Sequence, residues 1–280
     1  MKIKFYMLMM ALFALSAVSC SDEKDEPAEK PAEKVAGIYD GYTLASCNYF
    51  SNSVTAKEQV KIAATGDATV NITFTSDTWG TFTISDATVT IDADSYSIKG
   101  DGITKMGHQG VEKEYDCSFE GVVQVSSSSA VFTFSVPSVM GGLTIEFIKG
   151  EIPADLVVAG TYSGYSKAVA QYFPDGMYTD DQVIAVESNG DGTYKVDYVS
   201  DTWGTFTIAK ASLVVENDLY TLTGVGVTKM GMNGTTNDYE CELTAVIDIF
   251  KEDPKFTFSV PAVMGGLTIE FSTGDMPVTE

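Results

Sequence analysis

Two kinds of side chain in this sequence could carry chemistry: one histidine, and a set of aromatic and methionine residues. His108 is the only histidine, and the general base of a reaction at neutral pH is most often an imidazole. The second half of the chain repeats the first, as described below, and has Met232 where the first half has His108. We therefore expect a solvated loop histidine rather than a catalytic one.

Sequence motifs for hydrolytic, redox or phosphate chemistry are absent. The chain has no His-Glu-x-x-His, Cys-x-x-Cys or Gly-x-Ser-x-Gly, and no phosphate-cradling glycine loop. Its carboxylates gather in turns, for example at Asp92, Asp94, Glu216 and Asp218, where Asp side chains bond the local backbone. A calcium site is the alternative, but the spaced loop of a known calcium binder is missing. We predict a non-enzymatic protein with no metal and no cofactor.

The two tryptophans are the first candidates for ligand binding. Trp79 and Trp203 lie in two segments of identical sequence, residues 76–84 and residues 200–208. Counting by twos along the following strand turns Trp79 outward, unless Gly80 introduces a bulge. An outward indole predicts a sugar-stacking platform, whereas an inward one predicts a plug at the end of the core. We favour the plug.

Methionines and a tyrosine-phenylalanine pair also recur at matching places in loop-like segments. Flexible thioethers at the mouth of a pocket suit an apolar ligand, or they fill gaps where the fold closes. The Tyr-Phe pairs form either a lid over a pocket or ordinary packing. With the tryptophans, the candidate ligand-binding residues are Met106, Met230, Met140, Met264, Tyr49, Phe50, Tyr172 and Phe173.

An internal duplication organises the chain. Three segments of the first half recur almost unchanged in the second, so chance similarity is excluded. The matched segments are 76–84 with 200–208, 104–107 with 228–231, and 132–147 with 256–271, the last with one exchange, Ser138 for Ala262. We place the copies at residues 36–153 and 159–280, each of ordinary domain size, and treat residues 154–158 as a short apolar linker.

Both copies show the alternation of half-buried antiparallel strands. Apolar residues alternate with Thr, Ser or Glu, as at 132–136, and turn signals such as Asn-Gly-Asp-Gly at 189–192 separate the runs. The many short strands, without a convincing amphipathic helix, predict an all-β fold. Sequential hairpins favour an up-and-down barrel over a sandwich, because a closed barrel has no exposed edge.

Two motifs at the ends of each copy carry a family resemblance. The opening Gly-x-Tyr-x-Gly-Tyr occurs at 37–42 and 160–165, and each copy closes with Val-Pro-x-Val-Met-Gly-Gly-Leu-Thr-Ile-x-Phe. Together with the strand count, they resemble the calycin-like β-barrel domain of Bacteroides lipoproteins. The resemblance covers both copies and implies two tandem calycin or lipocalin-like antiparallel β-barrels. It implies no particular activity.

The N-terminus predicts an exported lipoprotein. Two lysines, an apolar run and small residues precede Cys20, which is the order of an export signal. Residues 17–20, Ala-Val-Ser-Cys, resemble a lipoprotein signal-peptidase box in which the cysteine becomes the acylated N-terminus. We assign residues 1–19 as the signal peptide and 20–35 as the lipidated cysteine and an acidic tether. An ordinary secretory leader that contains a cysteine is the alternative.

The acidic run after the cysteine bears on localisation. Residues 21–26, Ser-Asp-Glu-Lys-Asp-Glu, resemble the surface-export signal of Bacteroidetes lipoproteins, which implies display on the outer face of the outer membrane. A solvated linker is the alternative, because an acidic run does not collapse. The chain has 17 basic and 39 acidic residues, with a net charge of −22, and none of the basic residues is arginine. Nucleic acid is therefore excluded as a partner.

Three cysteines remain in the mature chain: Cys47, Cys117 and Cys241. Cys117 and Cys241 occupy matching positions, whereas Cys47 corresponds to Ala170, so a disulfide repeated in both copies is impossible. A single bridge between Cys47 and Cys117 is one alternative in an exported protein. Three reduced thiols that act as small buried hydrophobes are the alternative that we favour.

The leading functional hypothesis is a non-enzymatic surface lipoprotein, anchored through Cys20, that binds a small apolar or amphipathic ligand at one open end of each barrel. A protein-interaction or adhesion module with solid barrels is the first alternative, since an eight-stranded barrel can be filled by its own side chains. A surface glycan-binding protein is the second, and it requires Trp79 and Trp203 to be exposed.

Overall fold

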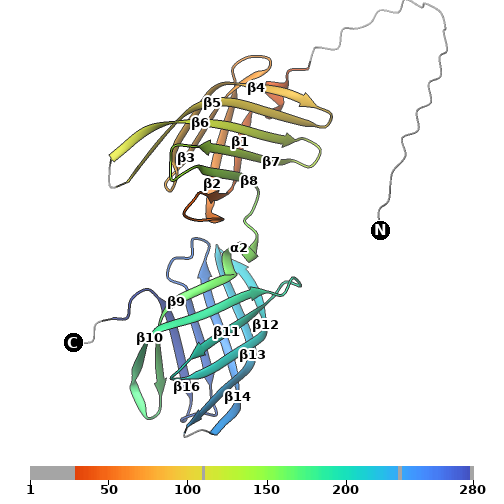
Figure 1. The fold of residues 1–280 in the computed structure, drawn as a ribbon. Coiled ribbons are helices and arrows are strands. Elements are labelled where there is room, and N and C mark those ends of the chain that lie inside the picture. Colours follow the sequence, from red (N-terminus) through yellow and green to blue (C-terminus); the bar gives the residue numbers. More distant parts are fainter. Residues whose placement is uncertain (1–28, 109–110, 233–234, 278–280) are drawn as a thin grey trace, which may run out of the picture.

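The computed structural model describes residues 29–108, 111–232 and 235–277, which fold into two closed antiparallel β-barrels (Figure 1). Consecutive strands pair in chain order, and the first strand of each barrel closes on the last. The first barrel comprises β1 (Gly37–Ser46), β2 (Ser53–Ala64), β3 (Thr69–Ser76), β4 (Gly80–Asp92), β5 (Ser95–His108), β6 (Val111–Gln124), β7 (Ser129–Val136) and β8 (Leu143–Lys149). The second comprises β9 (Gly160–Ala170), β10 (Phe173–Ser188), β11 (Thr193–Ser200), β12 (Gly204–Glu216), β13 (Leu219–Met232), β14 (Thr235–Asp248), β15 (Lys255–Val260) and β16 (Leu267–Thr273). The all-β class and the up-and-down topology are confirmed.

Alternation along the strands fills the inside of the first barrel with apolar side chains. On β3, Val70, Ile72 and Phe74 are buried while the residues between them are exposed. Phenylalanine rings then stack across the interior, and the ring centroids of Phe74 and Phe134 lie 5.1 Å apart. The largest fully buried side chains of this barrel are Phe74, Phe82, Phe119, Phe132, Phe134 and Phe147.

The second barrel repeats this interior with tyrosines in place of two apolar side chains, Tyr194 for Val70 and Tyr198 for Phe74. Tyr198 stands where the first barrel has Phe74, and its ring centroid lies 5.4 Å from that of Phe258. The Tyr198 hydroxyl donates a 2.7 Å hydrogen bond to Gln182 Oε1, so the buried phenol is satisfied. In both barrels, aromatic side chains occupy the space in which a lipocalin-type ligand would lie.

A short helix precedes the first strand of each barrel and closes one of its ends. α1 (Pro31–Val35) buries Ala32 and Val35 completely, and the Tyr39 hydroxyl donates a 2.6 Å hydrogen bond to the Val35 carbonyl. The Ala32 N–H also bonds the carbonyl of Asp67 in the β2–β3 turn at 3.1 Å. Residues 31–35 thus belong to the packed barrel, although the sequence placed them in the tether.

The matching helix of the second barrel is α2 (Ala154–Val158). Val157 and Val158 are fully buried, and the Tyr162 hydroxyl donates a 2.8 Å hydrogen bond to the Val158 carbonyl. The Tyr194 hydroxyl donates a 2.6 Å bond to Asp155 Oδ1. The segment interpreted from its sequence as a linker is therefore a plug, and its apolar composition serves the core of the second barrel.

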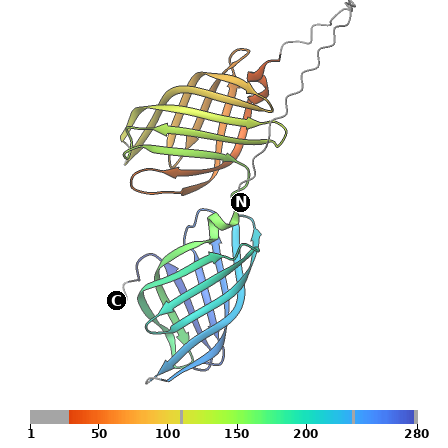
Figure 2. The ribbon, with the colours of Figure 1, turned by 45° about the vertical axis from the view of Figure 1, so that its right-hand side comes forward.

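We call the helix-closed end of each barrel its plug end and the opposite end its rim. Figures 1 and 2 show α2 at one end of the second barrel and the β13–β14 hairpin at the other. The rim carries the turns that follow β1, β3, β5 and β7 in the first barrel and their counterparts in the second.

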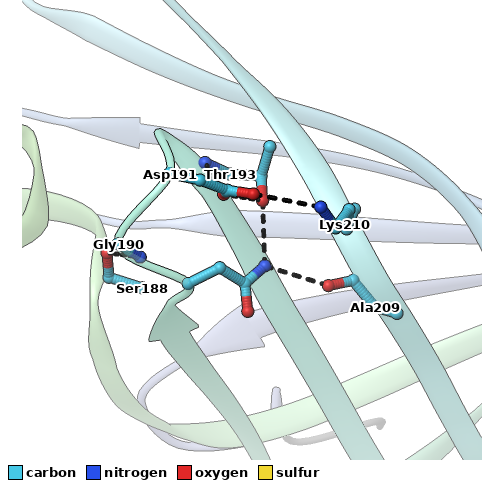
Figure 3. Close-up of polar contacts among 7 residues, drawn as sticks. Ser188, Gly190, Asp191, Thr193, Ala209 and Lys210 are labelled. Atoms are coloured by element: carbon cyan, nitrogen blue, oxygen red, sulfur yellow. Dashed lines mark hydrogen bonds and ion pairs between the residues drawn. The ribbon is translucent and has the colours of Figure 1, made fainter.

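A plug-end turn shows why the turn signals in the sequence are reliable. In the β10–β11 turn, Asp191 Oδ1 accepts a 3.1 Å hydrogen bond from the Thr193 N–H, and its Oδ2 accepts one from Lys210 Nζ at 3.0 Å (Figure 3). The hydrogen bonds from Thr193 and Lys210 lower the pKa of Asp191 to about 2. Asn189 Nδ2 ties the same turn to the Ala209 carbonyl at 3.0 Å.

The cysteines and the helices settle two smaller points. Cys47, Cys117 and Cys241 are free thiols, and burial raises the pKa of both Cys117 and Cys241 to about 11. The interpretation as small buried hydrophobes is confirmed for these two.

Within the described ranges, no helix is long and apolar enough to cross a membrane.

Candidate functional site

The β3–β4 turn at the rim brings Trp79 over the end of the first barrel. Ser76 Oγ accepts hydrogen bonds from the N–H groups of Thr78 and Trp79 at 3.2 and 3.1 Å, which holds the turn closed. Gly80 then begins β4 with φ of +82°, and a Cβ there would lie 2.1 Å from the Lys105 carbonyl oxygen. This left-handed residue reverses the alternation and turns the indole inward.

Both tryptophans are buried. Trp79 is 6% exposed and Trp203 is 4% exposed. The Trp79 indole Nε1 donates to Thr43 Oγ1 and that of Trp203 donates to Thr179 Oγ1, each at 3.2 Å. The prediction that each indole turns inward and fills the end of the core is therefore confirmed. A sugar-stacking platform is excluded, because it needs exposed rings.

Phe50 and Phe173 pack on these indoles. The ring centroids of Phe50 and Trp79 are 6.0 Å apart, and those of Phe173 and Trp203 are 5.9 Å apart. The phenylalanine of each predicted Tyr-Phe pair therefore covers the tryptophan. The tyrosines point elsewhere, since Tyr49 is 81% exposed and Tyr172 is 77% exposed.

A rim pocket of about 680 Å³ opens beside Trp79 in the first barrel. Met106 and Met140, both predicted from the sequence, line it together with Trp79. Met106 packs against the core, whereas Met140 lies in the β7–β8 turn with φ of +50° and is 47% exposed. The pocket lining further includes Ser76, Gly80, Lys105, Tyr115, Val139 and Leu143.

The second barrel has a rim pocket of about 660 Å³ at the matching place. Trp203, Met230 and Met264 line it, as their counterparts line the first. Six of the ten predicted ligand-binding residues thus line two equivalent pockets. Shared lining residues that the prediction missed include Gly80 and Gly204, Lys105 and Lys229, Tyr115 and Tyr239, and Val139 and Val263. All eight belong to matched positions of the duplication, which is the signal that could have found them.

Beneath each rim lies a set of buried polar side chains, which we call the polar layer. Each barrel contributes four, from matching positions of its first, second, third and fifth strands. They are Thr43, Glu58, Ser76 and Thr104 in the first barrel, and Ser166, Gln182, Ser200 and Thr228 in the second. Among the described residues these are all of the buried Ser, Thr, Glu and Gln side chains, and they lie in the rim halves of the barrels, whereas the buried hydroxyls of Tyr39 and Tyr162 lie at the plug ends.

The polar layer is bonded to the tryptophan turn in the first barrel. Ser76 Oγ donates a 2.6 Å hydrogen bond to Glu58 Oε1 while it accepts from the turn backbone. Burial raises the pKa of Glu58, and the neighbouring Asp77 carboxylate adds to the effect, although the bond from Ser76 opposes it. Gln182, an uncharged amide, occupies the matching position of the second barrel.

Charges at the pocket mouth are solvated and mixed. Lys105 pairs with Glu114 at 3.3 Å, and both side chains are more than half exposed, so the pair adds little stability. No cluster of three or more metal-ligating side chains occurs in the part of the chain that the structure describes. The rim pocket is thus lined by Trp, Met and Tyr side chains together with polar and charged ones, among them Asp77 and Lys105 in the first barrel and Asp201 and Lys229 in the second.

Two solved structures match this chain over most of its length. One is a protein described as a putative outer membrane protein from Bacteroides fragilis, with 22% identity and a TM-score of 0.58 over 87% of this chain and 99% of the other. At that identity the likeness shows the fold alone. A protein of unknown function from Nostoc punctiforme covers 89% of this chain and 100% of its own at 8% identity, with a TM-score of 0.24.

A comparison with curated proteins gives no match. The model of the calycin-like beta-barrel domain matches residues 35–148 and again residues 158–273, which is most of the chain. Each match coincides with one closed barrel of eight strands. The chain therefore belongs to the calycin-like beta-barrel domain family and carries two tandem copies of that domain.

Proposed function

We propose that the protein is an outer-membrane lipoprotein, displayed at the cell surface, that binds a small amphipathic ligand in the rim pocket of each barrel without catalysing a reaction. The proposal locates the ligand at the rim because side chains fill the barrel interiors. Apolar ligand surface would be buried against the Trp, Met and Tyr side chains, and edge polar groups would orient it.

One observation carries the proposal: two of the four rim turns, β3–β4 and β7–β8, are kept between the copies, whereas the plug-end turns vary. The β3–β4 turn is identical in both copies, and the β7–β8 turn differs only at Ser138 and Ala262. By contrast, the β4–β5 turn reads Asp-Ala-Asp-Ser at 92–95 in the first copy and Glu-Asn-Asp-Leu at 216–219 in the second. Barrel closure makes equal demands at both ends, so a role in closure does not explain why the two turns that are kept both lie at the rim.

The size of the pockets supports a small-molecule ligand. Pockets that bind small molecules typically measure about 300–1,000 Å³ and are mostly apolar with a few placed polar groups. The two rim pockets, of about 680 and 660 Å³, fall within this range. Methionine side chains at the mouth adapt to ligands of different shape.

The N-terminal sequence supports the proposed location, and so do the side chains that face inward and outward in the barrel walls. The signal peptide and Cys20 lie outside the described residues, so lipidation rests on the sequence. Both barrels bury apolar side chains inside, and their outer faces mix Thr, Ser and Lys with exposed valines, unlike the apolar outer band of a membrane-spanning barrel. A lipid on Cys20 would supply the attachment, and α1, the first described element after it, lies at the plug end of the first barrel.

A binding experiment with a neutral fluorophore tests the ligand proposal. N-phenyl-1-naphthylamine should bind two sites per chain with increased emission. Met140→Glu should remove one site and Met264→Glu the other, because a carboxylate in the mouth disfavours an apolar guest; both methionines are partly exposed, so folding is retained. Val122→Glu, on the outer wall of β6, is the matched control. Unchanged stoichiometry in the double Met variant would refute rim binding.

A second experiment tests the lipid anchor and the display at the cell surface. Cys20→Ala should release the mature protein from membranes, and protease added to intact cells should digest the wild-type protein. Membrane association that persists in Cys20→Ala would exclude the lipid anchor. Protection from protease in intact cells would place the protein on the inner side.

The exposed tyrosines favour a second candidate, a protein-interaction module. Tyr49 and Tyr172 project into solvent at matching positions of the two rims, and Tyr is enriched at protein interfaces. If a protein partner is the ligand, Tyr49→Ser with Tyr172→Ser should abolish its capture and leave fluorophore binding intact.

A further inference from the structure

The polar layer contains one buried hydroxyl in each barrel that has no partner. Thr104 Oγ1 and Thr228 Oγ1 are fully buried and make no hydrogen bond to any described residue. A buried hydroxyl without a partner destabilises the fold, because it has given up its hydrogen bonds to water. The two threonines occupy matching positions, so the same cost is carried twice.

Both threonines lie directly under the rim pockets. Thr104 pairs across β5–β6 with Tyr115, and Met106 follows it on the same face of β5. Tyr115 and Met106 line the first pocket. The matching threonine, Thr228, pairs with Tyr239 in the second barrel. Movement of one flexible methionine side chain would connect each hydroxyl to the pocket above it.

We infer that the polar layer is the inner half of each rim site, and that the ligand carries an uncharged hydrogen-bonding head group which pairs with Thr104 in the first barrel and Thr228 in the second. This inference rests on the proposed function. The apolar part of the ligand lies in the rim pocket against Trp and Met, and its head group passes beneath them.

The composition of the layer selects against a charged head group. No lysine belongs to it, so an anionic head group would be buried without a counter-charge. In the first barrel an anion would also face the Glu58 carboxyl. In the second barrel the corresponding residue is Gln182, which offers no charge to a cation. A hydroxyl or an amide is the head group that both barrels accept.

The two tryptophans allow each site to be measured separately. Trp203→Phe leaves Trp79 as the sole indole and reports on the first barrel, while Trp79→Phe reports on the second. The probes are 1-decanol, decanoate and decylammonium, which share one tail. We expect 1-decanol to change the emission of both reporters, and decanoate to bind at least tenfold more weakly.

Thr104→Val, in the Trp203→Phe background, decides the role of the hydroxyl. It should weaken 1-decanol binding to the first barrel about fivefold to tenfold, which is the loss of affinity expected from one hydrogen bond. It should also raise the Tm of the ligand-free protein, because the buried hydroxyl without a partner is removed. Thr83→Val, on the exposed face of the neighbouring strand, is the matched control and should change neither. For the second barrel the test variant is Thr228→Val, and its control is Thr205→Val on the exposed face of the neighbouring strand β12.

The outcomes separate this inference from the proposal on which it rests. If 1-decanol binds and Thr104→Val leaves its affinity unchanged, the head-group assignment is overturned and rim binding stands. If decanoate binds as tightly as 1-decanol, the uncharged class is overturned. If none of the three probes binds to either reporter protein and N-phenyl-1-naphthylamine does not bind either, the proposed rim binding is refuted, and the head-group inference is refuted with it.

Discussion

The indole Nε1 of Trp79 donates a hydrogen bond of 3.2 Å to Thr43 Oγ1 across the rim of the first barrel. Both partners are buried, so neither can be satisfied by bulk water when the other is lost. The bond ties the β3–β4 turn to β1, two elements that are not neighbours in the barrel wall. It thereby fixes the ring that forms one side of the rim pocket.

Replacement of Thr43 by valine should therefore destabilise the first barrel. The variant keeps the shape of the side chain and leaves the buried indole N–H unpaired, at an expected cost of about 1–3 kcal/mol in the free energy of unfolding. Urea denaturation followed by Trp79 fluorescence, in a Trp203→Phe background, measures it. Thr81→Val, on β4, serves as the comparison. A loss below about 0.5 kcal/mol would mean that the hydrogen bond contributes no net stability.

Gly80 is predicted to tolerate no side chain. Its φ is +82°, and an added Cβ would meet the Lys105 carbonyl oxygen at 2.1 Å, so both strain and a backbone clash oppose Gly80→Ala. The matched control is Gly142→Ala, where φ is +111° but nothing lies within 4 Å. The control should cost about 1–2 kcal/mol through φ alone, and Gly80→Ala should cost clearly more. Equal losses would show that the strand at Lys105 yields freely.

Glu58 is predicted to make stability fall as the pH rises. Burial is the main cause that raises its folded-state pKa above the ordinary value of 4.5, so the folded protein binds a proton more tightly than the unfolded chain. The protonated carboxyl stabilises fully below pH 4.5, and this contribution is lost as the pH rises through the folded pKa. Glu58→Gln, which copies the second barrel, should be more stable than wild type at pH 8 and lose that advantage toward pH 4.

Chemical denaturation at a series of pH values tests this sign. Glu120→Gln is the control, because that carboxylate is exposed and pairs with Lys99 at 2.8 Å. A Glu58→Gln variant that is less stable than wild type at every pH would show that the ionised carboxylate is the form the fold prefers.

The sequence predicted the barrels well because their strands obey one simple rule. Alternation of period two places Val70, Ile72 and Phe74 inside, and the duplication supplies an independent check in the second copy. The same rule failed at Trp79, because one glycine with a positive φ reversed the direction of the side chain. Pattern counting detects a glycine at that position but not its dihedral angle.

Two other features escaped the sequence for different reasons. The plug helices have five residues each, which is too short for a period of 3.6 to show. Thr104 reads as an ordinary strand threonine, and only the structure shows that its hydroxyl is buried without a partner. The methionines recur beside glycines and line the rim pockets in both copies, but Met106 and Met230 lie on β5 and β13 rather than in loops.

The last prediction concerns where the second barrel begins. If α2 is a plug rather than a linker, a fragment that starts at Pro153 should fold more stably than one that starts at Gly160. The shorter fragment loses Val157 and Val158, which are fully buried, and leaves the Tyr162 hydroxyl without the Val158 carbonyl. Each buried valine contributes about 1.5–3 kcal/mol, so the difference in unfolding free energy should reach several kcal/mol.

The variant Tyr162→Phe, in the longer fragment, separates the hydrogen bond from the packing and should cost about 1 kcal/mol. Equal stability of the two fragments would return residues 154–158 to the role of a linker, because a segment that packs into the core cannot be removed without exposing it.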